Sequence, residues 1–218
     1  MKNKPFWEPS KETIAQSNIF KMMQRHGFNN YDDFWKWSVS NKETFWEETI
    51  QNLGIQFTEK YTSIVDISEG VENAKWLKYS KLNIVDSCFQ NDENATAIIF
   101  QEEGKELQKV TQKELLNLVN RIANGLIELG LKEGDKIAID MPMTLEAVAI
   151  YLAGIKAGMP IVTIADSFTP NEIEVRLKIT NPKLIFTQDV LQRAEKKLPL
   201  FSKVTEANAP KAIVLRVS

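Results

Sequence analysis

The chain has 218 residues, a formal charge of −2 and a hydrophobic fraction of 43%. This composition is that of an ordinary globular protein and excludes collagen-like, disordered and disulfide-rich chains. Because positive and negative charges nearly cancel, no global field attracts the chain to nucleic acid or to an anionic membrane.

The rare residue types exclude several kinds of site. Cys88 is the only cysteine and His26 the only histidine, so the sequence offers neither an internal disulfide nor a Cys/His zinc site. No stretch approaches the roughly 20 apolar residues that span a bilayer, and the first residues lack a signal-peptide pattern. We therefore expect a cytoplasmic protein with no nucleic-acid and no membrane partner, in which Cys88 is a small buried residue.

Aromatic residues dominate the first part of the chain, and all five tryptophans lie within residues 1–94. Helical spacing of apolar residues predicts three short amphipathic helices, one that ends at Gly27, one over residues 31–37 and one that ends at Gly54. The stretch 56–80 has no clean period and is predicted to be an irregular connection. We predict that residues 1–94 form a small helical cap whose aromatic side chains make a core rather than a ligand platform.

The remaining residues, 95–218, alternate between strands and helices. A hairpin is predicted over residues 95–110, and Thr111 with Glu114 forms a capping box that begins a helix. Further strands are predicted over 136–139, 160–164, 183–187 and 212–215, with helices from Thr144 and Thr169 and a short helix or turn over 189–197. Strands separated by helices favour right-handed crossovers, so we expect an α/β fold with a doubly wound, mainly parallel sheet. The hairpin would be an antiparallel addition to that sheet.

Ligands of such sheets usually bind beyond the carboxyl ends of the strands. Asp140, Asp166 and Asp189 lie at or just beyond three predicted strand ends. Three carboxylates gathered there could hold Mg²⁺, but Asp is also common as a cap of helices and turns, and we favour that interpretation. The usual glycine-rich nucleotide motifs and hydrolase motifs do not occur.

A local basic cluster follows the last inner strand. It consists of Arg193, Lys196 and Lys197, with Lys203 nearby. These side chains could bind a phosphate through charge-assisted hydrogen bonds. A solvated basic face is the plainer interpretation of the same pattern.

Several segments resemble the acetyl-CoA synthetases in order and spacing. They are Ile139–Val148 (IDMPMTLEAV), Ser167–Leu177 (SFTPNEIEVRL), Pro182–Asp189 (PKLIFTQD) and, upstream, Trp76-Leu77 and Leu82–Cys88 (LNIVDSC). The chain is thereby identified as a member of the adenylate-forming acyl-CoA synthetase superfamily, and it is most similar to the acetyl-CoA-synthetase-like acyl-activating enzymes. The resemblance implies an incomplete ANL-type N-terminal domain. Residues 1–94 would be the helical cap and connection, and residues 95–218 the first part of the AMP-binding α/β domain.

The resemblance also implies a reaction and a binding site. Enzymes of this family use ATP and Mg²⁺ to convert a small carboxylate to an acyl-adenylate, and then transfer the acyl group to coenzyme A. Arg193, Ala194, Glu195 and Lys196 correspond to the family's stretch that contacts the ribose-phosphate end of coenzyme A. Glu195 departs from the usual small neutral residue, and a carboxylate beside a phosphate is repulsive unless it turns outward.

The family's other functional parts would lie beyond Ser218: the phosphate-gripping loop, the acyl pocket, the magnesium-binding glutamate and the adenylation lysine. We therefore expect an N-terminal portion of an acid-thiol ligase that is inactive by itself. It would contain no catalytic residue and no metal ligand, and would bind none of ATP, coenzyme A and Mg²⁺ completely. The alternative is a non-catalytic ligand-binding or interaction module with the same fold. An apolar surface where the remainder docks would favour self-association.

Overall fold

The computed structural model describes residues 6–194 and 196–217. Two compact units make up the chain. The N-terminal unit comprises Met1–Ile55 and Glu59–Lys81, and the C-terminal unit comprises Gln56–Thr58 and Leu82–Ser218. Each unit is described by itself below. The domain boundary that we predicted after residue 94 stays a prediction.

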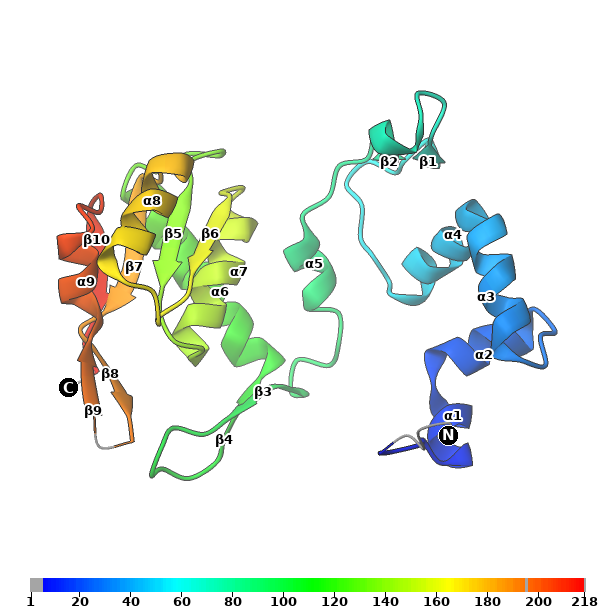
Figure 1. Ribbon diagram of the computed structural model, residues 1–218, viewed down its shortest axis with the longest axis horizontal. Helices are drawn as coiled ribbons and strands as arrows, with labels where there is room; N and C mark the ends of the chain where they lie inside the picture. Colours follow the sequence, from blue (N-terminus) through cyan, green and yellow to red (C-terminus); the bar gives the residue numbers. More distant parts are fainter. Residues whose placement is uncertain (1–5, 195, 218) are drawn as a thin grey trace. The chain divides into compact units, whose positions relative to one another are not determined.

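The N-terminal unit consists of short helices followed by a small hairpin (Figure 1). Its elements are α1 (Lys11–Gln16), α2 (Asn18–Arg25), α3 (Tyr31–Ser40), α4 (Lys42–Asn52), β1 (Ser63–Asp66), η1 (Val71–Asn73) and β2 (Lys75–Lys78). The predicted first helix is in fact two, because Ser17 has an extended backbone and its side chain accepts a hydrogen bond from the Phe20 amide to begin α2.

The prediction of an irregular connection over residues 56–80 was wrong, because β1 and β2 pair there in antiparallel register with Val65 opposite Trp76. Each of these strands has four residues. Strands this short contain too few positions for a period of two to stand out in the sequence.

The N-terminal unit has a small aromatic core. Met22, Met23 and Phe34 are buried, and Trp37 and Phe45 pack against them. The ring centroids of Phe34 and Trp37 lie 5.6 Å apart, within the range of favourable aromatic pairs. Phe34, Trp37 and Phe45 therefore act as packing groups, as their spacing predicts. The prediction does not hold for Tyr31 and Trp35, which are exposed.

The C-terminal unit contains the parallel sheet. Its elements are α5 (Ile84–Cys88), β3 (Thr96–Phe100), β4 (Gln108–Thr111), α6 (Gln112–Glu128), β5 (Ile137–Asp140), α7 (Leu145–Lys156), β6 (Ile161–Ile164), α8 (Pro170–Thr180), β7 (Leu184–Gln188), β8 (Val190–Arg193), β9 (Lys196–Pro199), α9 (Leu200–Glu206) and β10 (Ala212–Leu215). The four-stranded sheet has the order β10-β7-β5-β6, and each neighbouring pair is parallel. This confirms the predicted α/β fold with a parallel sheet.

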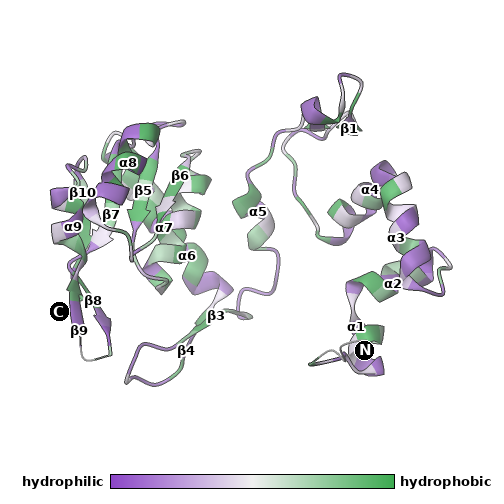
Figure 2. Ribbon diagram, viewed as in Figure 1, coloured by the Kyte–Doolittle hydropathy of each residue, from purple (hydrophilic) through white to green (hydrophobic). Residues whose placement is uncertain are grey.

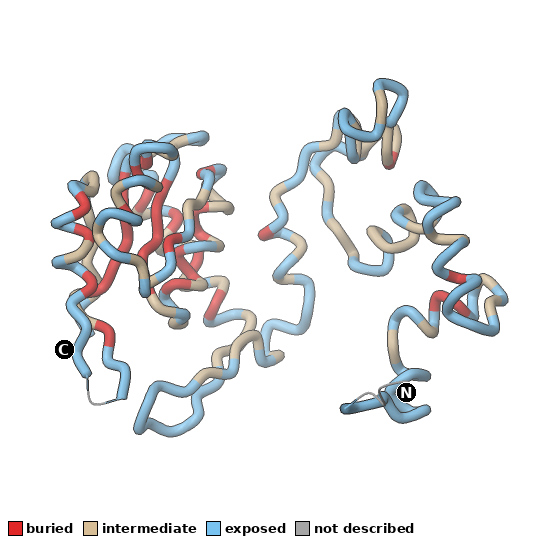
Figure 3. Tube along the Cα trace, in the orientation of Figure 1, coloured by how far each residue is buried: buried red, intermediate tan, exposed pale blue. Residues whose placement is uncertain are grey.

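Helices cover both faces of this sheet (Figure 1). On one face, Ile137 and Ile139 of β5 pack with Leu126 of α6 and Ile150 of α7. On the other face, Ala138 of β5 packs with residues of α8 and α9. The strands are accordingly apolar along their length (Figure 2), and the buried residues of the unit gather on them (Figure 3). Alternate residues of one strand thus pack into the two hydrophobic cores on opposite faces of the sheet, as in doubly wound folds.

The helix starts follow the predicted capping signals. Thr111 with Glu114 and Thr169 with Glu172 form complete capping boxes, and Thr144 accepts a hydrogen bond from the Ala147 amide. These side-chain oxygens satisfy backbone N–H groups that the first turn of a helix leaves without partners. None of the described helices is long and apolar enough to cross a lipid bilayer.

Two predictions for this unit need correction. The β3–β4 hairpin exists, but within the described residues it pairs with itself and does not extend the parallel sheet. The segment 189–197 is not a helix or turn but the antiparallel hairpin β8–β9, and α9 follows it. Arg, Ala, Glu and Lys are good helix formers, and no Asn-Gly or Asp-Gly pair marks the turn, so local propensity points the wrong way.

Candidate functional site

The carboxyl ends of β5, β6 and β7 lie side by side in the C-terminal unit. Asp140, the last residue of β5, is in register with Ile164 of β6 and with Thr187 of β7. Three segments begin at this edge: the turn into α7, the loop from Ala165 to Thr169 that leads into α8, and the β8–β9 hairpin. The sheet therefore brings together the parts that sequence reasoning marked as a ligand site.

The register of the β8–β9 hairpin decides which cations act together. Arg193 lies directly opposite Lys196, and Gln192 lies opposite Lys197. Directly opposed residues of an antiparallel pair project on the same face, and successive residues project on opposite faces. Arg193 and Lys196 therefore share one face of the hairpin, whereas Lys197 lies on the other.

The tip of the hairpin already binds anionic oxygen. The backbone N–H of Ala194 donates to Oε2 of Glu103 at 2.8 Å, and Nη2 of Arg193 lies 3.4 Å from Oδ2 of Asp166. Ala194 has a φ of 52°, a left-handed conformation that serves the tight turn. Glu195, the fourth predicted site residue, lies outside the described residues.

These donors are of the kinds that bind phosphate, and two carboxylates hold them here. The Arg193 side chain is 62% exposed, so its guanidinium remains accessible to a ligand in spite of its contact with Asp166. Arg193 and Lys196 supply positive charge, and the Ala194 amide supplies a backbone donor that now binds the Glu103 carboxylate. Phosphate oxygens prefer this combination of guanidinium, ammonium and amide donors.

The sequence groups Lys203 with the basic residues that could bind a phosphate, but its ammonium group binds the protein backbone instead. It lies on α9, and its Nζ donates to the backbone oxygens of Asp166 and Phe168. Arg176 of α8 stacks over the Phe168 ring at 3.9 Å from its centroid. Both cations hold the loop between β6 and α8, so Lys203 is a structural partner of that loop and not a free surface charge.

The three strand-end aspartates do not form a magnesium site. Asp166 faces Arg193, and Oδ1 of Asp189 accepts hydrogen bonds from the amides of Val190 and Val217. No group of three His, Cys, Asp or Glu side chains within the described residues could hold a metal ion. The favoured capping interpretation is wrong for Asp140, because Thr144 caps the helix that follows it. It does not describe Asp189 either, which lies between the strands β7 and β8 and not at the start of a helix.

Asp140, at the carboxyl edge of the sheet, is a buried carboxyl group without hydrogen bonds to the described residues. It is fully buried, and neither of its carboxylate oxygens has a hydrogen-bond partner within the described residues. Burial raises the pKa of Asp140 to about 6; the positive charge of Lys203 opposes this rise and the negative charge of Asp166 adds to it. Sequence reasoning missed this environment, although a charged residue that ends the apolar run Ile137–Ile139 is a usable signal.

Cys88 also differs from its prediction. It is exposed, not buried, at the end of α5, and its thiol lies 3.4 Å from the Ile84 carbonyl oxygen as a weak donor. Within α5, Val85 is the buried residue.

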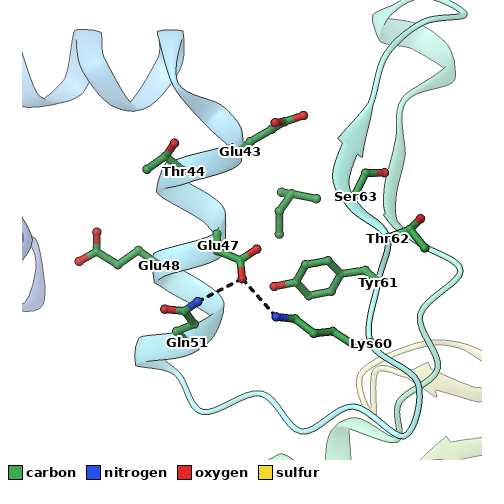
Figure 4. A pocket seen from close by; sticks show the side chains of 10 residues that line it. Glu43, Thr44, Glu47, Glu48, Gln51, Lys60, Tyr61, Thr62 and Ser63 are labelled. Atoms are coloured by element: carbon green, nitrogen blue, oxygen red, sulfur yellow. Dashed lines mark hydrogen bonds and ion pairs between the residues drawn. The ribbon is translucent and has the colours of Figure 1, made fainter.

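A separate pocket of about 750 Å³ lies between α4 and β1 in the N-terminal unit (Figure 4). Its polar side chains interact with one another: Glu47 accepts a hydrogen bond from Gln51 at 3.1 Å and pairs with Lys60 at 3.6 Å. Burial, with a hydrogen bond to Glu47, raises the pKa of Tyr61 to about 12, so its hydroxyl stays protonated. The polar groups of this shallow pocket already bind each other, so few hydrogen-bond donors and acceptors remain for a ligand.

The family descriptions that match the chain agree with this architecture. The description "AMP-binding enzyme" matches residues 85–217, and "Acetyl-coenzyme A synthetase N-terminus" matches residues 31–88. The first match covers the parallel sheet and its helices. The second covers α3, α4 and the hairpin that follows them.

Curated relatives point to the same group of enzymes, and a solved structure shares the fold. The chain is 36% identical to the probable acyl-activating enzyme 17, peroxisomal, of Arabidopsis thaliana, over 97% of this chain and 32% of that protein. It is 34% identical to the hexanoyl-CoA synthase of Cannabis sativa, over 98% of this chain and 33% of that protein. The acetoacetyl-CoA synthetase from Streptomyces lividans shares the fold with a TM-score of 0.85 and 24% identity, over 98% of this chain and 35% of that one.

The chain thus spans about a third of the length of the curated relatives that it matches. The resemblance inferred from its ordered segments is confirmed by these similarities. The chain belongs to the family of AMP-binding enzymes, in which it corresponds to an N-terminal portion of an acyl-CoA synthetase-like protein.

Proposed function

We propose that the chain is part of an ATP-dependent acyl-CoA synthetase and supplies its fold and one side of its coenzyme A site. The reaction would join a small carboxylate to AMP with release of pyrophosphate, and then pass the acyl group to the thiol of coenzyme A. Names of relatives such as acetyl-, acetoacetyl- and hexanoyl-CoA synthetases support a carboxylate substrate. A cytoplasmic location stays a prediction, and one of the relatives is described as peroxisomal.

The observation that carries this proposal is the pairing of Arg193 with Lys196 on one face of the β8–β9 hairpin. In the proposed complex, the Arg193 guanidinium binds a coenzyme A phosphate with two of its N–H groups, and Lys196 adds a second positive charge. The Ala194 amide donates to a phosphate oxygen once Glu103 gives way. Glu195 sits between Ala194 and Lys196 in sequence, and the proposal requires its carboxylate to turn away from the phosphate.

The described residues offer fewer binding groups for Mg²⁺ and ATP than for coenzyme A. The described residues contain no group of three potential ligands for Mg²⁺, and the sequence has no glycine-rich phosphate loop for ATP. Arg193, Ala194 and Lys196 bind and orient coenzyme A, but none of them is placed to activate a carboxylate. We therefore propose that the 218-residue chain alone does not form acyl-adenylate.

Replacement of Arg193 by Ala tests the coenzyme A contact. In a full-length acyl-CoA synthetase that carries this N-terminal portion, Arg193→Ala should raise KM for coenzyme A. Loss of one charge-assisted phosphate contact typically costs about 1 to 3 kcal/mol, a factor of roughly 5 to 150. The adenylation half-reaction, followed by pyrophosphate exchange, should be unchanged because coenzyme A enters only afterwards. Lys197→Ala, on the opposite face of the same hairpin, is the matched control. Equal coenzyme A kinetics for wild type and Arg193→Ala would make Arg193 a solvated surface residue.

Incubation of the 218-residue chain with ATP, Mg²⁺, acetate and coenzyme A tests its proposed inactivity. We expect no AMP above a protein-free control, measured by chromatography over several hours. Robust formation of AMP or acyl-CoA would overturn this part of the proposal and leave the coenzyme A contact to be judged by the variant above.

A further inference from the structure

A carboxylate from a distant part of the C-terminal unit holds the tip of the β8–β9 hairpin. The Ala194 N–H donates to Oε2 of Glu103 at 2.8 Å, although 91 positions separate the two residues. Glu103 belongs to the turn of the β3–β4 hairpin, and both hairpins project from the same side of the unit (Figure 1). The amide that the proposed function assigns to a phosphate is thus already bound to an anion of the chain.

The conformation of the β3–β4 turn presents Glu103 to the other hairpin. The Lys105 N–H donates to the Glu102 carbonyl oxygen at 3.0 Å, which defines a four-residue turn, and Gly104 at its third position has a φ of 75°. A positive φ at that position is typical of a type II turn and suits glycine. The Glu102 carboxylate forms an ion pair with Lys105 inside the turn, whereas the Glu103 carboxylate reaches outward to Ala194.

The β8–β9 turn leaves the Ala194 amide available to an acceptor outside the hairpin. Arg193 pairs with Lys196, and Ala194 follows Arg193 with a φ of 52°. A β-turn closes with the N–H of its fourth residue, so the N–H of its second residue is not used by the turn itself. A backbone amide carries one N–H. Glu103 and a phosphate oxygen therefore compete for a single donor.

The second carboxylate at the tip does not compete in this way. Asp166 Oδ2 lies 3.4 Å from Nη2 of Arg193, whose side chain is 62% exposed. A guanidinium has five N–H groups, so Arg193 can bind a phosphate while Asp166 stays in place. Of the two carboxylates, Glu103 must leave and Asp166 can remain.

We propose that Glu103 is a resident anion of the coenzyme A site, which occupies the Ala194 amide until a phosphate of coenzyme A displaces it. A phosphate carries more negative charge than a carboxylate and has three acceptor oxygens, so it can bind Ala194, Arg193 and Lys196 together. Glu103 lowers the affinity for coenzyme A, because its hydrogen bond must break first. The displacement rests on the proposed function, whereas the contact between Glu103 and Ala194 does not.

The exchange of anions also couples the two hairpins. When the phosphate takes the Ala194 amide, the β3–β4 turn loses its hydrogen bond to the β8–β9 hairpin. Binding of coenzyme A at one hairpin should therefore increase the mobility of the other, and by linkage any change that loosens the β3–β4 turn should favour binding.

NMR of the ligand-free chain tests the contact itself. In the ¹⁵N-labelled 218-residue chain, Glu103→Gln should move the Ala194 amide signal, because a neutral side chain polarises the N–H less than a carboxylate does. Glu106→Gln removes the same charge from an exposed position of the same connection. It is the matched control and should leave the signal in place. An Ala194 signal that neither variant moves, or that both move equally, would overturn the proposal.

Titration with coenzyme A, followed through the Ala194 signal, tests the displacement. Glu103→Gln should bind coenzyme A about two- to tenfold more tightly than the wild type, the factor that corresponds to one competing hydrogen bond. Glu106→Gln should bind as the wild type does. Equal dissociation constants for wild type and Glu103→Gln would overturn the displacement and leave the coenzyme A contact standing. An Ala194 signal that coenzyme A moves in neither protein would overturn the contact of this amide with coenzyme A, and the displacement with it.

Backbone relaxation tests the coupling of the hairpins. The ¹⁵N order parameter of Gly104 reports motion of the β3–β4 turn on the picosecond to nanosecond scale. It should fall when the wild type is saturated with coenzyme A. In Glu103→Gln it should be low without ligand and change little on saturation. A wild-type value that stays constant at saturation would show that the turn is not released, and would overturn the coupling.

Discussion

The two units of the chain bury their apolar side chains to different extents. In the C-terminal unit, β5, β6 and β7 contribute to cores on both faces of the sheet. In the N-terminal unit one buried cluster joins Met22, Met23 and Phe34, whereas Trp46 and Trp76 are 41% and 50% exposed although their rings contact each other. Isolated helices shorter than about 12 residues are marginal in water. The helices of the N-terminal unit are that short, and its stability therefore depends on a thin core together with its caps and ion pairs.

One carboxyl group from each unit shows two opposite effects of surroundings on ionisation. In the N-terminal unit, hydrogen bonds from Tyr61, Gln51 and Lys60 lower the pKa of Glu47, because they favour its charged form. In the C-terminal unit, burial without hydrogen bonds raises the pKa of Asp140. The difference teaches that hydrogen bonds favour the charge of Glu47, whereas burial without them makes the charge of Asp140 oppose folding.

The largest expected effect concerns the core of the sheet. Ile185 of β7 is fully buried in the cluster beneath α8 and α9. Ile185→Ala should lower the free energy of unfolding by about 2 to 5 kcal/mol, because it leaves a cavity in a packed core. Urea unfolding followed by far-UV circular dichroism measures the change. Ile179→Ala, at a 76% exposed position of α8, is the control and should change it by less than about 0.5 kcal/mol.

Tryptophan fluorescence can show whether Ile185→Ala destabilises the two units equally. All five tryptophans lie in the N-terminal unit, so their fluorescence follows that unit separately. We expect Ile185→Ala to move the circular dichroism transition more than the fluorescence transition. Equal shifts of both would show that the two units unfold as one, and would end the energetic distinction drawn between them.

The second effect is a pH dependence of stability caused by Asp140. Its pKa is about 6 in the folded chain and about 3.8 in the unfolded chain. Between these values the folded state binds more protons, so stability must fall as pH rises from about 4 to 6, by up to roughly 3 kcal/mol. Above pH 6 the loss is complete and constant. Asp140→Asn should abolish the fall, and the measurement is urea unfolding of both proteins at several pH values. A wild-type curve parallel to that of Asp140→Asn over this range would refute the assignment.

The sequence predicts the frame of the C-terminal unit because local and long-range signals agree there. Ile137–Ile139 is an apolar run between a glycine that ends one helix and the cap residue Thr144 of the next, and such a run can only be a buried strand or helix. The β8–β9 hairpin was not predictable in this way. Its residues favour a helix, and only the pairing of Val190 with Pro199 and of Leu191 with Leu198 makes them strands.

The candidate site was predicted in part. The sequence marks Arg193 and Lys196 as basic residues near a strand end, and the hairpin register then separates Lys196 from Lys197. The environment of Asp140 depends on Lys203, which a helix far along the chain brings to the same edge. Spacing within one segment contains no information on such a long-range neighbour, so the sequence favours the wrong interpretation of Asp140 as a cap of a helix or turn.

A third effect distinguishes a helix with a side-chain cap from one without. Thr169 accepts a hydrogen bond from the Glu172 amide at the start of α8, whereas Asn41 makes no side-chain cap bond at the start of α4. Thr169→Ala should cost about 1 kcal/mol, and Asn41→Ala a few tenths at most. Thermal melts measured by circular dichroism for the first variant and by tryptophan fluorescence for the second give the two values. Asn41 Nδ2 also donates to the Trp37 carbonyl oxygen at the end of α3 at 3.1 Å. A larger loss for Asn41→Ala would mean that this exposed hydrogen bond contributes more than expected.

The smallest effect concerns the ion pairs of the N-terminal unit. Oε2 of Glu48 lies 2.6 Å from Nε2 of His26, and Oε1 accepts a hydrogen bond from Nε of Arg25 at 2.6 Å. Burial alone would raise the pKa of Glu48, but the hydrogen bonds from His26 and Arg25 outweigh it and lower that pKa. Because the Arg25 side chain is 48% exposed, solvent screens the pair, and Glu48→Gln should cost only about 0.2 to 1 kcal/mol.

The sign of this pH dependence is opposite to that of Asp140. A lowered carboxyl pKa gives stability that is present above the unfolded value of about 4.5 and is lost as pH falls through the lower folded value. Tryptophan-detected melts of wild type and Glu48→Gln should therefore differ at pH 6 and converge once the pH has fallen through the lowered pKa of folded Glu48. Lys60→Met, which removes the 3.6 Å pair with Glu47 in the same unit, serves as the comparison for an ion pair of poorer geometry and should cost less. A difference for Glu48→Gln that persisted at low pH would assign the loss to packing of the side chain rather than to its charge.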